Sequence, residues 1–315
     1  MADFERKQNG GDPVVSVVLP TYNRAAYLKR AIRSVLCQSF DDFELIIVDD
    51  DSDDGTEEVA LDYKDNRIRY VRLKERVGAS EARNIGVRYS RGVLVAFQDS
   101  DDEWSCEKLE ACVRALELAP DCVGVFSGYI QVNRVRVRYM PIALPPSDPT
   151  KMARALLFGN FVGTPTAVVR KETLEAVGGF DRNLPQMEDW DLFIRIAVCG
   201  RLLFIEEPLI VAHCTPGSLN TSLMARRKAA SLIYKKNKRM IESDRLLRVH
   251  WLRMMGDLSM RAGERKGGRG LLFRAFVMNP WNIRLAGLLV LALMFGRHYA
   301  KVKSWFANQS LQESE

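Results

Sequence analysis

The sequence predicts an α/β fold in which a mostly parallel, Rossmann-like sheet is flanked by helices and followed by a basic helical extension. The first observation is an alternation of short apolar runs with amphipathic segments over residues 14–97. Strand–helix–strand repeats of this kind place helices on both faces of a parallel sheet. The second is a change of charge along the chain. Residues 1–220 carry 27 Lys and Arg against 34 Asp and Glu, whereas residues 221–315 carry 19 against 6.

The composition fits one large domain with an appendage. The chain has 315 residues, 47% hydrophobic and 27% charged, which excludes wholesale disorder. We expect a polar leader at residues 1–13, a domain at residues 14–220 and a basic helical region at residues 221–315. The leader has no apolar stretch, so no signal peptide is expected. Six cysteines without a CxxC pair indicate reduced thiols, and hence a cytoplasmic location, rather than disulfides or structural zinc.

The elements follow from the spacing of apolar residues. Strands are predicted at residues 14–19, 43–48, 68–73 and 93–97, with helices at residues 24–40, 56–63 and 79–89. The patterns then predict a helix at 104–118, a strand at 122–127, a hairpin at 129–140, a loop at 141–149, a helix at 189–198 and strands at 202–205 and 209–212. Basic helices follow from residue 222, interrupted by glycines within residues 267–270. The longest apolar run, residues 285–296, is shorter than the roughly 20 residues that a spanning helix needs.

Polar clusters follow three of the predicted strands, at residues 20–23, 49–52 and 99–102. In open α/β sheets, ligands bind outside the carboxyl ends of the strands. The sequence therefore predicts a binding site at this edge of the sheet.

The strongest cluster is Asp99, Ser100, Asp101 and Asp102. Three carboxylates within four residues raise each other's pKa unless a cation neutralises them. Oxygen ligands of this kind suit Mg²⁺ or Mn²⁺, which commonly bind one or two carboxylates and substrate phosphates. The alternative is an acidic turn in which Asp102 caps the following helix.

A second acidic cluster contains Asp49, Asp50, Asp51, Asp53 and Asp54. A calcium-binding EF-hand is disfavoured, because the twelfth position counted from Asp49 is an alanine rather than a glutamate. A carboxylate at a strand end can instead accept hydrogen bonds from a base or a ribose. The alternative, a solvated acidic loop, applies best to Asp53 and Asp54.

Two further patterns are weaker, and only the first leaves function and structure equally open. Glu188 and Asp189 open a helix, where acids are stabilised by the helix dipole, but a carboxylate there can also act as a general base. Arg83, just inside a predicted helix, has the paired donors that suit a phosphate, although a surface arginine is the plainer interpretation.

These motifs, in this order, resemble the family 2 glycosyltransferases, which have the GT-A fold. The resemblance covers about residues 14–220, and its motifs are LPTYNR (19–24), SVLCQSF (34–40), FELIIVDDDSDDGT (43–56), GASEARNIGV (78–87), FQDSDDEW (97–104), GGFD (178–181) and MEDWDLFIRI (187–196). Each motif alone is weak, but seven in register are specific.

The resemblance implies a donor site. Pro20, Tyr22 and Asn23 are similar to the first nucleotide-contacting loop, with Tyr22 placed to stack on the base. Asp50 matches the base-contacting aspartate, with Asp49 beside it. The resemblance also places a further donor-binding set near the ribose and diphosphate: Arg83, Asp99 and Ser100.

It also implies a metal and a catalytic pair. Asp99, Ser100 and Asp101 match the DxD-type element, and Asp101 and Asp102 are expected to hold Mn²⁺ or Mg²⁺. Asp189 matches the proposed catalytic base, and Glu188 is expected to position the acceptor. Two positions depart from the family pattern. Asp51 stands where a glycine or small residue is usual. His213 stands two positions early for an extra metal ligand, so we do not expect it to be one.

The implied function is transfer of a sugar, with inversion, from a UDP-, dTDP- or GDP-sugar to a hydroxyl acceptor in polysaccharide, O-antigen or glycolipid synthesis. The acceptor is expected to be a saccharide or a lipid-linked saccharide. Two alternatives stay open: a non-enzymatic nucleotide-sugar-binding relative, and a nucleotidyltransferase. The second is expected to have a glycine-rich loop after the first strand, and LPTYNRAAY contains no glycine.

The basic C-terminal region predicts an anionic partner. Arg and Lys clusters combine there with the apolar run and with Trp251, Trp281 and Trp305. Basic helices with an apolar face bind anionic membrane surfaces, so we expect a peripheral protein on the inner face of the membrane. The alternative is a helical cap with a charged surface. No nucleic-acid-binding motif accompanies the charge, and no nucleic acid partner is expected.

Overall fold

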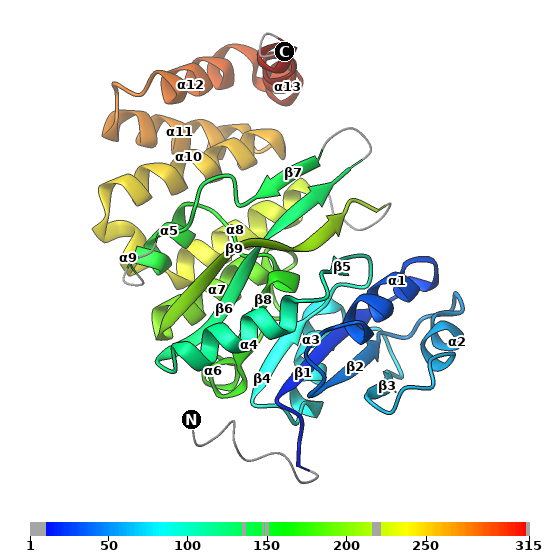
Figure 1. Cartoon of the computed structure of the whole chain (residues 1–315). Coiled ribbons are helices and arrows are strands. Elements are labelled where there is room, and N and C mark those ends of the chain that lie inside the picture. Colours follow the sequence, from blue (N-terminus) through cyan, green and yellow to red (C-terminus); the bar gives the residue numbers. More distant parts are fainter. Residues whose placement is uncertain (1–10, 134–136, 147, 149–150, 216–221, 313–315) are drawn as a thin grey trace. The chain divides into compact units, whose positions relative to one another are not determined.

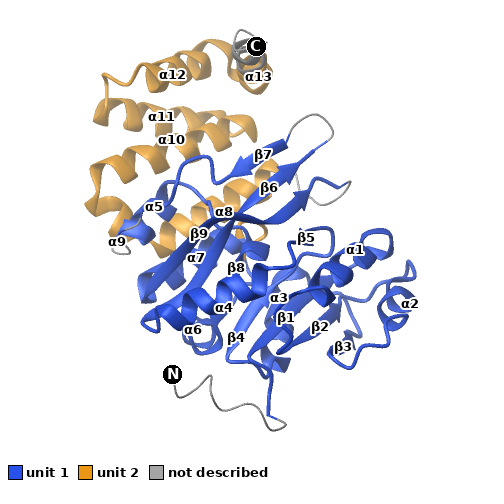
Figure 2. Ribbon diagram, viewed as in Figure 1, with its two compact units in different colours: residues 1–183, 188–219 blue, residues 184–187, 220–315 orange. Residues whose placement is uncertain are grey.

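The structure is a computed structural model that describes residues 11–133, 137–146, 148, 151–215 and 222–312. The chain divides into two compact units (Figure 2). Unit 1 comprises residues 1–183 and 188–219, and unit 2 comprises residues 184–187 and 220–315. Most of the predicted leader, parts of the loop at 141–149 and residues 216–218 lie outside the described residues.

The alternation predicted for residues 14–97 is confirmed in the first half of the sheet. Four parallel strands lie in the order β3-β2-β1-β4. Apolar side chains from both faces of β1 and β2 are buried, as expected for strands covered by helices on both sides. The elements of this half are β1 (Val15–Thr21), α1 (Ala25–Leu36), β2 (Phe43–Asp49), α2 (Thr56–Leu61), β3 (Ile68–Arg72), α3 (Ala79–Tyr89) and β4 (Leu94–Phe97).

The second half of the sheet is mixed. β8 pairs antiparallel with β4 and β6, and β9 runs parallel to β6 (Figure 1). The predicted hairpin is confirmed by the antiparallel pair β6 and β7. The elements are β5 (Glu103–Trp104), α4 (Lys108–Leu118), β6 (Cys122–Val132), β7 (Val137–Met140), α5 (Met152–Phe158), a 3-10 turn (Thr164–Thr166), β8 (Ala167–Arg170), α6 (Lys171–Ala176), α7 (Glu188–Cys199) and β9 (Arg201–His213).

Three predicted elements of unit 1, one helix and two strands, were wrong in extent. The helix expected from residue 104 begins at Lys108, because Glu103 and Trp104 pair with β9 instead. The two strands expected at 202–205 and 209–212 are one strand, β9, which pairs with β6 across register shifts around Pro208. A proline removes a ladder donor and is accommodated at such irregularities, so the break in the pattern marks a bulge rather than a strand end.

Unit 2 is helical. Its elements are α8 (Leu223–Lys236), α9 (Lys238–Ser243), α10 (Arg245–Arg261), α11 (Arg265–Met278), α12 (Ile283–Phe295), a 3-10 turn (Gly296–His298) and α13 (Tyr299–Gln312). Buried side chains of α10, α11, α12 and α13 form one core cluster.

The glycines expected to interrupt the helices lie inside α11. A Cβ at Gly268 would lie 2.8 Å from Met260 Cγ, and one at Gly256 of α10 would lie 2.9 Å from Leu272 Cγ. Both distances are too short for real side chains, so these glycines allow α10 and α11 to approach closely. Helix packing therefore overrides the low helix propensity of glycine here.

The apolar segment near the C-terminus is longer than the sequence indicated. Residues Ile283–Trp305 form a helical segment of 23 residues that is long and apolar enough to cross a membrane by length and composition. The segment is not one regular α-helix, since a 3-10 turn at Gly296–His298 separates α12 from α13.

Candidate active site

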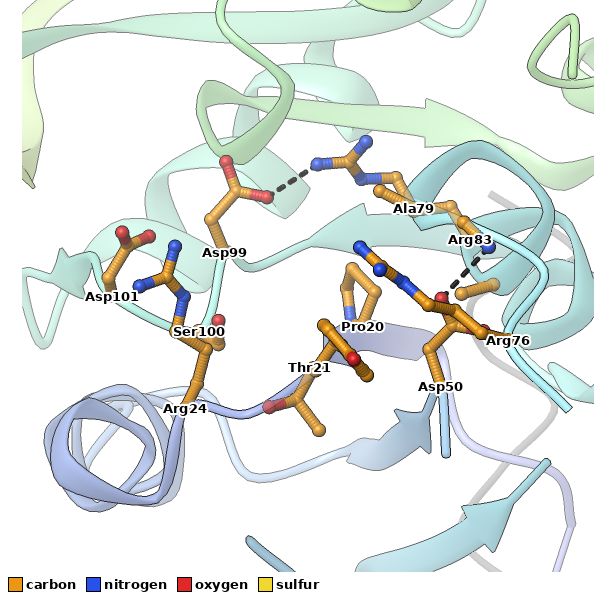
Figure 3. A pocket seen from close by; sticks show the side chains of 13 residues that line it. Pro20, Thr21, Arg24, Asp50, Arg76, Ala79, Arg83, Asp99, Ser100 and Asp101 are labelled. Carbon is orange, nitrogen blue, oxygen red and sulfur yellow. Dashed lines mark hydrogen bonds and ion pairs between the residues drawn. The ribbon is translucent and has the colours of Figure 1, made fainter. Parts of the chain in front are cut away.

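A pocket of about 280 Å³ opens at the carboxyl ends of β1, β2 and β4 (Figure 3). Its lining residues come from segments far apart in the sequence: Pro20, Thr21, Tyr22, Arg24, Asp50, Arg76, Gly78, Ala79, Ala82, Arg83, Asp99, Ser100 and Asp101. Seven of the twelve predicted site residues are among them: Pro20, Tyr22, Asp50, Arg83, Asp99, Ser100 and Asp101. Asn23, Asp49, Asp102, Glu188 and Asp189 are not among the lining residues.

The aspartates that end and follow β2 accept hydrogen bonds from other residues of the chain. Asp49 Oδ1 accepts hydrogen bonds from the Ser52 amide and hydroxyl, and Oδ2 accepts one from the Tyr70 hydroxyl. Burial and the Asp49 carboxylate raise the pKa of Tyr70. Because Asp49 is fully buried and outside the pocket, its observed contacts are structural.

Asp50 faces the pocket and also supports one of its walls. Its two carboxylate oxygens accept the backbone N–H groups of Val77 and Gly78, at 2.7 and 2.8 Å. These residues lead into α3, so Asp50 fixes the approach to the helix that carries Arg83. A carboxylate has about four acceptor positions, which leaves capacity for a ligand.

Two residues with positive φ shape the loops beneath the pocket. Asn23 has φ 51° and exchanges two hydrogen bonds with Asp53, through its side-chain oxygen and amide. It therefore joins the loops after β1 and β2 rather than lining the pocket. Asp51 has φ 65°, a left-handed conformation that glycine adopts most readily and aspartate tolerates. This conformation explains physically why a glycine is usual at that position.

Tyr22 has a cationic partner in the pocket. The Arg76 guanidinium lies 3.9 Å from the centre of the Tyr22 ring, within the range of a cation–π contact. Arg76 was not predicted, because nothing in the sequence around it forms a recognisable motif. Figure 3 shows it on the same side of the pocket as Asp50.

Arg83 joins the strand end after β4 to the start of α7. Its two terminal nitrogens donate to Asp99 Oδ1 at 2.8 Å and to Glu188 Oε1 at 3.2 Å. Although burial opposes its charge, the attraction of Asp99 and Glu188 raises the pKa of Arg83. One permanent cation thus holds acids that are separated by about ninety residues of chain.

Asp101 and Asp102 face different surroundings. Asp101 lines the pocket, and its carboxylate accepts a hydrogen bond from the Thr215 hydroxyl. Asp102 is buried and accepts the backbone N–H of His213 at 3.0 Å. Burial, together with the charges of Asp99 and Asp101, raises the pKa of Asp102 to about 8.

The donor set suits a divalent cation that a substrate helps to hold. Within the described residues no group of three or more His, Cys, Asp and Glu side chains forms a ready-made metal site. Mg²⁺ commonly takes only one or two carboxylates and completes its shell with phosphate oxygens and water. Asp101, with Asp99 nearby in the same pocket, fits that requirement, whereas Asp102 is buried and does not line the pocket.

Asp189 lies at the first turn of α7, beside Glu188. Its Oδ2 accepts a hydrogen bond from the Asn160 side-chain amide at 2.8 Å, and its Oδ1 accepts the Trp190 backbone N–H. Burial and the negative charge of Glu188 raise the pKa of Asp189 to about 6. A carboxylate with this pKa is ionised at neutral pH and is more basic than an ordinary aspartate, which suits a general base.

Two of the motifs serve the scaffold around these acids. The Asn84 side chain donates a hydrogen bond to the Phe180 carbonyl and accepts one from the Phe180 N–H. These bonds fix α3 to the turn formed by Gly178 and Gly179, which directly precedes Phe180. Arg195 of α7 pairs with the buried Asp191 and donates to the Val177 and Gly179 carbonyls. The motifs around 84, 180 and 191 therefore hold the helices that present Arg83 and Asp189.

The family model described as glycosyl transferase family 2 matches residues 16–178, just over half of the chain. The chain belongs to this family. The matched range contains the whole pocket lining, and the acids of α7 follow it in the sequence.

Curated relatives carry related names. TuaG of Bacillus subtilis, named for teichuronic acid biosynthesis, is 43% identical over 119 residues, covering 37% of this chain and 47% of TuaG. WfgD of Escherichia coli, a UDP-Glc:α-D-GlcNAc-diphosphoundecaprenol β-1,3-glucosyltransferase, is 40% identical over 99 residues, covering 31% of this chain and 39% of WfgD. The match thus spans less than half the length of either relative.

Solved structures confirm the predicted GT-A fold of this family 2 glycosyltransferase. TarS of S. aureus (residues 1–349), in complex with UDP-GlcNAc, matches with a TM-score of 0.64 at 19% identity, covering 91% of each chain. The mannosyltransferase PcManGT of Pyrobaculum calidifontis, in complex with GDP-Man and Mn²⁺, matches with a TM-score of 0.58 at 20% identity, covering 97% of this chain and 89% of PcManGT.

Proposed function

We propose that this protein transfers a sugar from a nucleotide-sugar donor to a hydroxyl acceptor, with inversion at the anomeric carbon. The observation that carries the proposal is the meeting of acids from three parts of the chain. Asp50 and Asp99 face one pocket, and Arg83 links Asp99 to Glu188, the neighbour of Asp189. The family membership supports the same chemistry.

The pocket residues are assigned to the donor. Tyr22 and Arg76 offer flat faces for a base, and Asp50 offers acceptor positions for base or ribose hydrogen-bond donors. Arg83 supplies a buried positive charge close to where a diphosphate would lie. TarS was solved with UDP-GlcNAc and PcManGT with GDP-Man, which supports a nucleotide-sugar but leaves the base and sugar to experiment.

Asp101 is proposed to hold Mn²⁺ or Mg²⁺ together with the donor diphosphate. When bound, the metal stabilises the negative charge that develops on the leaving diphosphate. The presence of Mn²⁺ with GDP-Man in PcManGT supports this assignment. Asp102 was predicted to share the metal, and its bond to the His213 N–H supports a role in fixing the β9 end instead.

Asp189 is proposed to remove the proton from the acceptor hydroxyl as that oxygen attacks the anomeric carbon. The C–O bond to the acceptor forms while the bond to the diphosphate breaks, and the proton passes to the Asp189 carboxylate. Attack from the face opposite the leaving group inverts the configuration in one displacement. Asn160 and the Trp190 N–H orient the carboxylate, and Glu188 stands beside it to position the acceptor.

The acceptor is proposed to be a saccharide or a lipid-linked saccharide of the cell envelope, reached from the cytoplasmic side. The names of TuaG and WfgD support this class. The deciding experiment screens UDP-, GDP- and dTDP-sugars with Mn²⁺ for donor hydrolysis, and then tests the active donor on lipid-linked acceptors. If the folded protein neither binds nor hydrolyses any donor, a non-enzymatic role replaces the proposal.

A further inference from the structure

The outer face of the helical unit carries large apolar side chains that the fold does not use. In α12, Leu285, Leu289 and Ala292 are buried and pack into the core of unit 2. The other side of the same helix presents Ile283, Val290 and Met294, spaced seven and four residues apart and therefore on one stripe. Apart from Arg284, α12 contains only apolar residues, and a helix of this kind is typical of burial in protein or lipid rather than of a surface helix in water.

The neighbouring helix α11 and the turn that joins it to α12 also carry exposed apolar side chains. In α11, Phe273 and Val277 are exposed, while Leu272 and Ala275 are buried. Trp281, in the turn between α11 and α12, is 94% exposed, and Ile283 is 84% exposed. Figure 1 shows α11 and α12 as adjacent layers within unit 2. We call these side chains the apolar surface: Phe273, Val277, Trp281, Ile283, Val290 and Met294.

The charge around the apolar surface has one sign. Residues 265–304 contain eight Lys and Arg and no Asp or Glu. Among the cations, Arg274, Arg284 and Arg297 are exposed. An acid-free segment with eight cations and with exposed apolar and Trp side chains matches the headgroup region of an anionic bilayer.

We propose that the apolar surface of α11 and α12 is a docking site for an anionic lipid bilayer, in which α12 lies along the interface without crossing it. Trp281 and the apolar stripe enter the boundary between headgroups and acyl chains, and the surrounding arginines bind lipid phosphates.

Contacts within unit 2 favour the interfacial arrangement over a spanning one. Tyr299 is fully buried and donates a hydrogen bond to Asp257 of α10, and Lys303 pairs with the same carboxylate at 2.6 Å. A spanning Ile283–Trp305 would break these bonds and strip Leu285 and Leu289 from the core. An interfacial α12 keeps all of them.

The proposal is tested by sedimentation of the full-length protein with vesicles made of equal parts of phosphatidylcholine and phosphatidylglycerol. Wild-type protein is expected to sediment at low salt. The triple variant Val277→Ser, Trp281→Ser, Ile283→Ser is expected to bind about a thousandfold more weakly, since each inserted side chain contributes about tenfold. The cation variant Arg274→Gln, Arg284→Gln, Arg297→Gln is expected to lose about a hundredfold, at about fivefold per charge.

The matched control is Leu118→Ser, Ile142→Ser, which removes two equally exposed apolar side chains from unit 1 and is expected to bind as the wild type does. Circular dichroism and melting temperature confirm folding of each variant. Four outcomes would overturn the proposal. Three are wild-type protein that stays in the supernatant, an apolar triple variant that binds normally, and a wild-type dimer that this variant converts to monomer without any vesicle binding. The fourth is resistance of the protein in cell membranes to extraction by alkaline carbonate, which would show a spanning segment instead. Donor hydrolysis is measured separately, so loss of docking and loss of transfer are distinguishable.

Discussion

The two acidic clusters, which follow β2 and β4, are both rich in aspartate but differ in the hydrogen-bond donors that surround their carboxylates. After β2, the carboxylates of Asp49, Asp50, Asp53 and Asp54 accept hydrogen bonds from amides and hydroxyls of this loop and of neighbouring segments. Burial opposes ionisation of Asp54, but hydrogen bonds from Thr56 and Ala25 lower its pKa. After β4, the carboxylates of Asp99, Asp101 and Asp102 crowd together, and the pKa of Asp102 rises to about 8.

The difference shows that the number of acids is a poor guide to metal binding. The first cluster is surrounded by hydrogen-bond donors of the chain, so it builds loops and one wall of the pocket. The second cluster has fewer such donors for its charge, and we propose that a cation and a diphosphate complete it. Each experiment below separates the two clusters, or separates both from the acids of α7.

The largest expected effect belongs to Asp189→Asn. Removing the base should lower transfer by about 10²- to 10⁴-fold, because a positioned general base contributes on that scale. Donor binding should stay close to wild type, since Asp189 does not line the donor pocket. Steady-state kinetics and donor titration measure both, with the exposed Asp121→Asn as a control that should leave both unchanged. Equal loss of donor binding would refute the base role.

In the cluster after β4, the variants Asp101→Asn and Asp102→Asn distinguish which carboxylate binds the metal. Asp101→Asn should reduce Mn²⁺-dependent donor hydrolysis by roughly a hundredfold, because metal stabilisation of the leaving group is worth several kcal/mol. Asp102→Asn should cost less than about tenfold, since an amide oxygen can still accept the His213 N–H. Titrations of activity with Mn²⁺ compare the two variants. If Asp102→Asn reduces Mn²⁺-dependent hydrolysis more than Asp101→Asn does, Asp102 is the metal ligand instead.

In the first cluster, Asp49→Ala should affect stability more than chemistry. The substitution leaves the Ser52 amide, the Ser52 hydroxyl and the Tyr70 hydroxyl without their acceptor, which should destabilise the fold by about 3 kcal/mol. Urea unfolding measures this value. The exposed Asp62→Ala should change stability by less than about 0.5 kcal/mol. If the Asp49→Ala protein is stable but no longer binds the donor, the prediction that Asp49 contacts the donor would be supported instead.

The pH dependence of the transfer rate also tests Asp189 as the general base, with a smaller expected effect. The pKa of Asp189 is raised to about 6, and only the ionised carboxylate can accept a proton. The value of kcat/KM should therefore fall about tenfold per pH unit below 6 and level off above it. Asn160→Ala removes a hydrogen bond to the ionised form, so the midpoint should move to higher pH by up to about one unit. Asn183→Ala, which contacts Asp181 instead, should leave the midpoint in place.

The sequence predicted the fold and the edge of the sheet that holds the site, because strand periodicity and polar strand ends are local patterns. It did not predict Arg76, Asn160 or Thr215, whose contacts with Tyr22, Asp189 and Asp101 depend on how distant loops meet. It also grouped residues whose side chains point to different places. Asn23 and Asp49 are next to pocket residues in the chain, yet backbone φ at Asn23 and strand pleat at Asp49 direct them into the scaffold.

Local propensity failed where packing or pairing decided the structure. The glycines of α11 predicted a break, but close approach to α10 requires them within a helix. Two separate strands were predicted at 202–205 and 209–212, but pairing with β6 continues past the intervening Pro208 through a bulge. In both cases the decisive contact lies on an element that the local sequence does not contain.

The central claim is that the cluster after β4 binds a divalent cation together with a nucleoside diphosphate. The most direct test measures thermal unfolding of the wild type and of Asp101→Asn with UDP, GDP or dTDP, in Mn²⁺ or in EDTA. We predict that one nucleotide raises the melting temperature of the wild type only when Mn²⁺ is present, and that Asp101→Asn loses this increase while Asp189→Asn keeps it. An equal increase in EDTA, or an undiminished increase in Asp101→Asn, would contradict the claim.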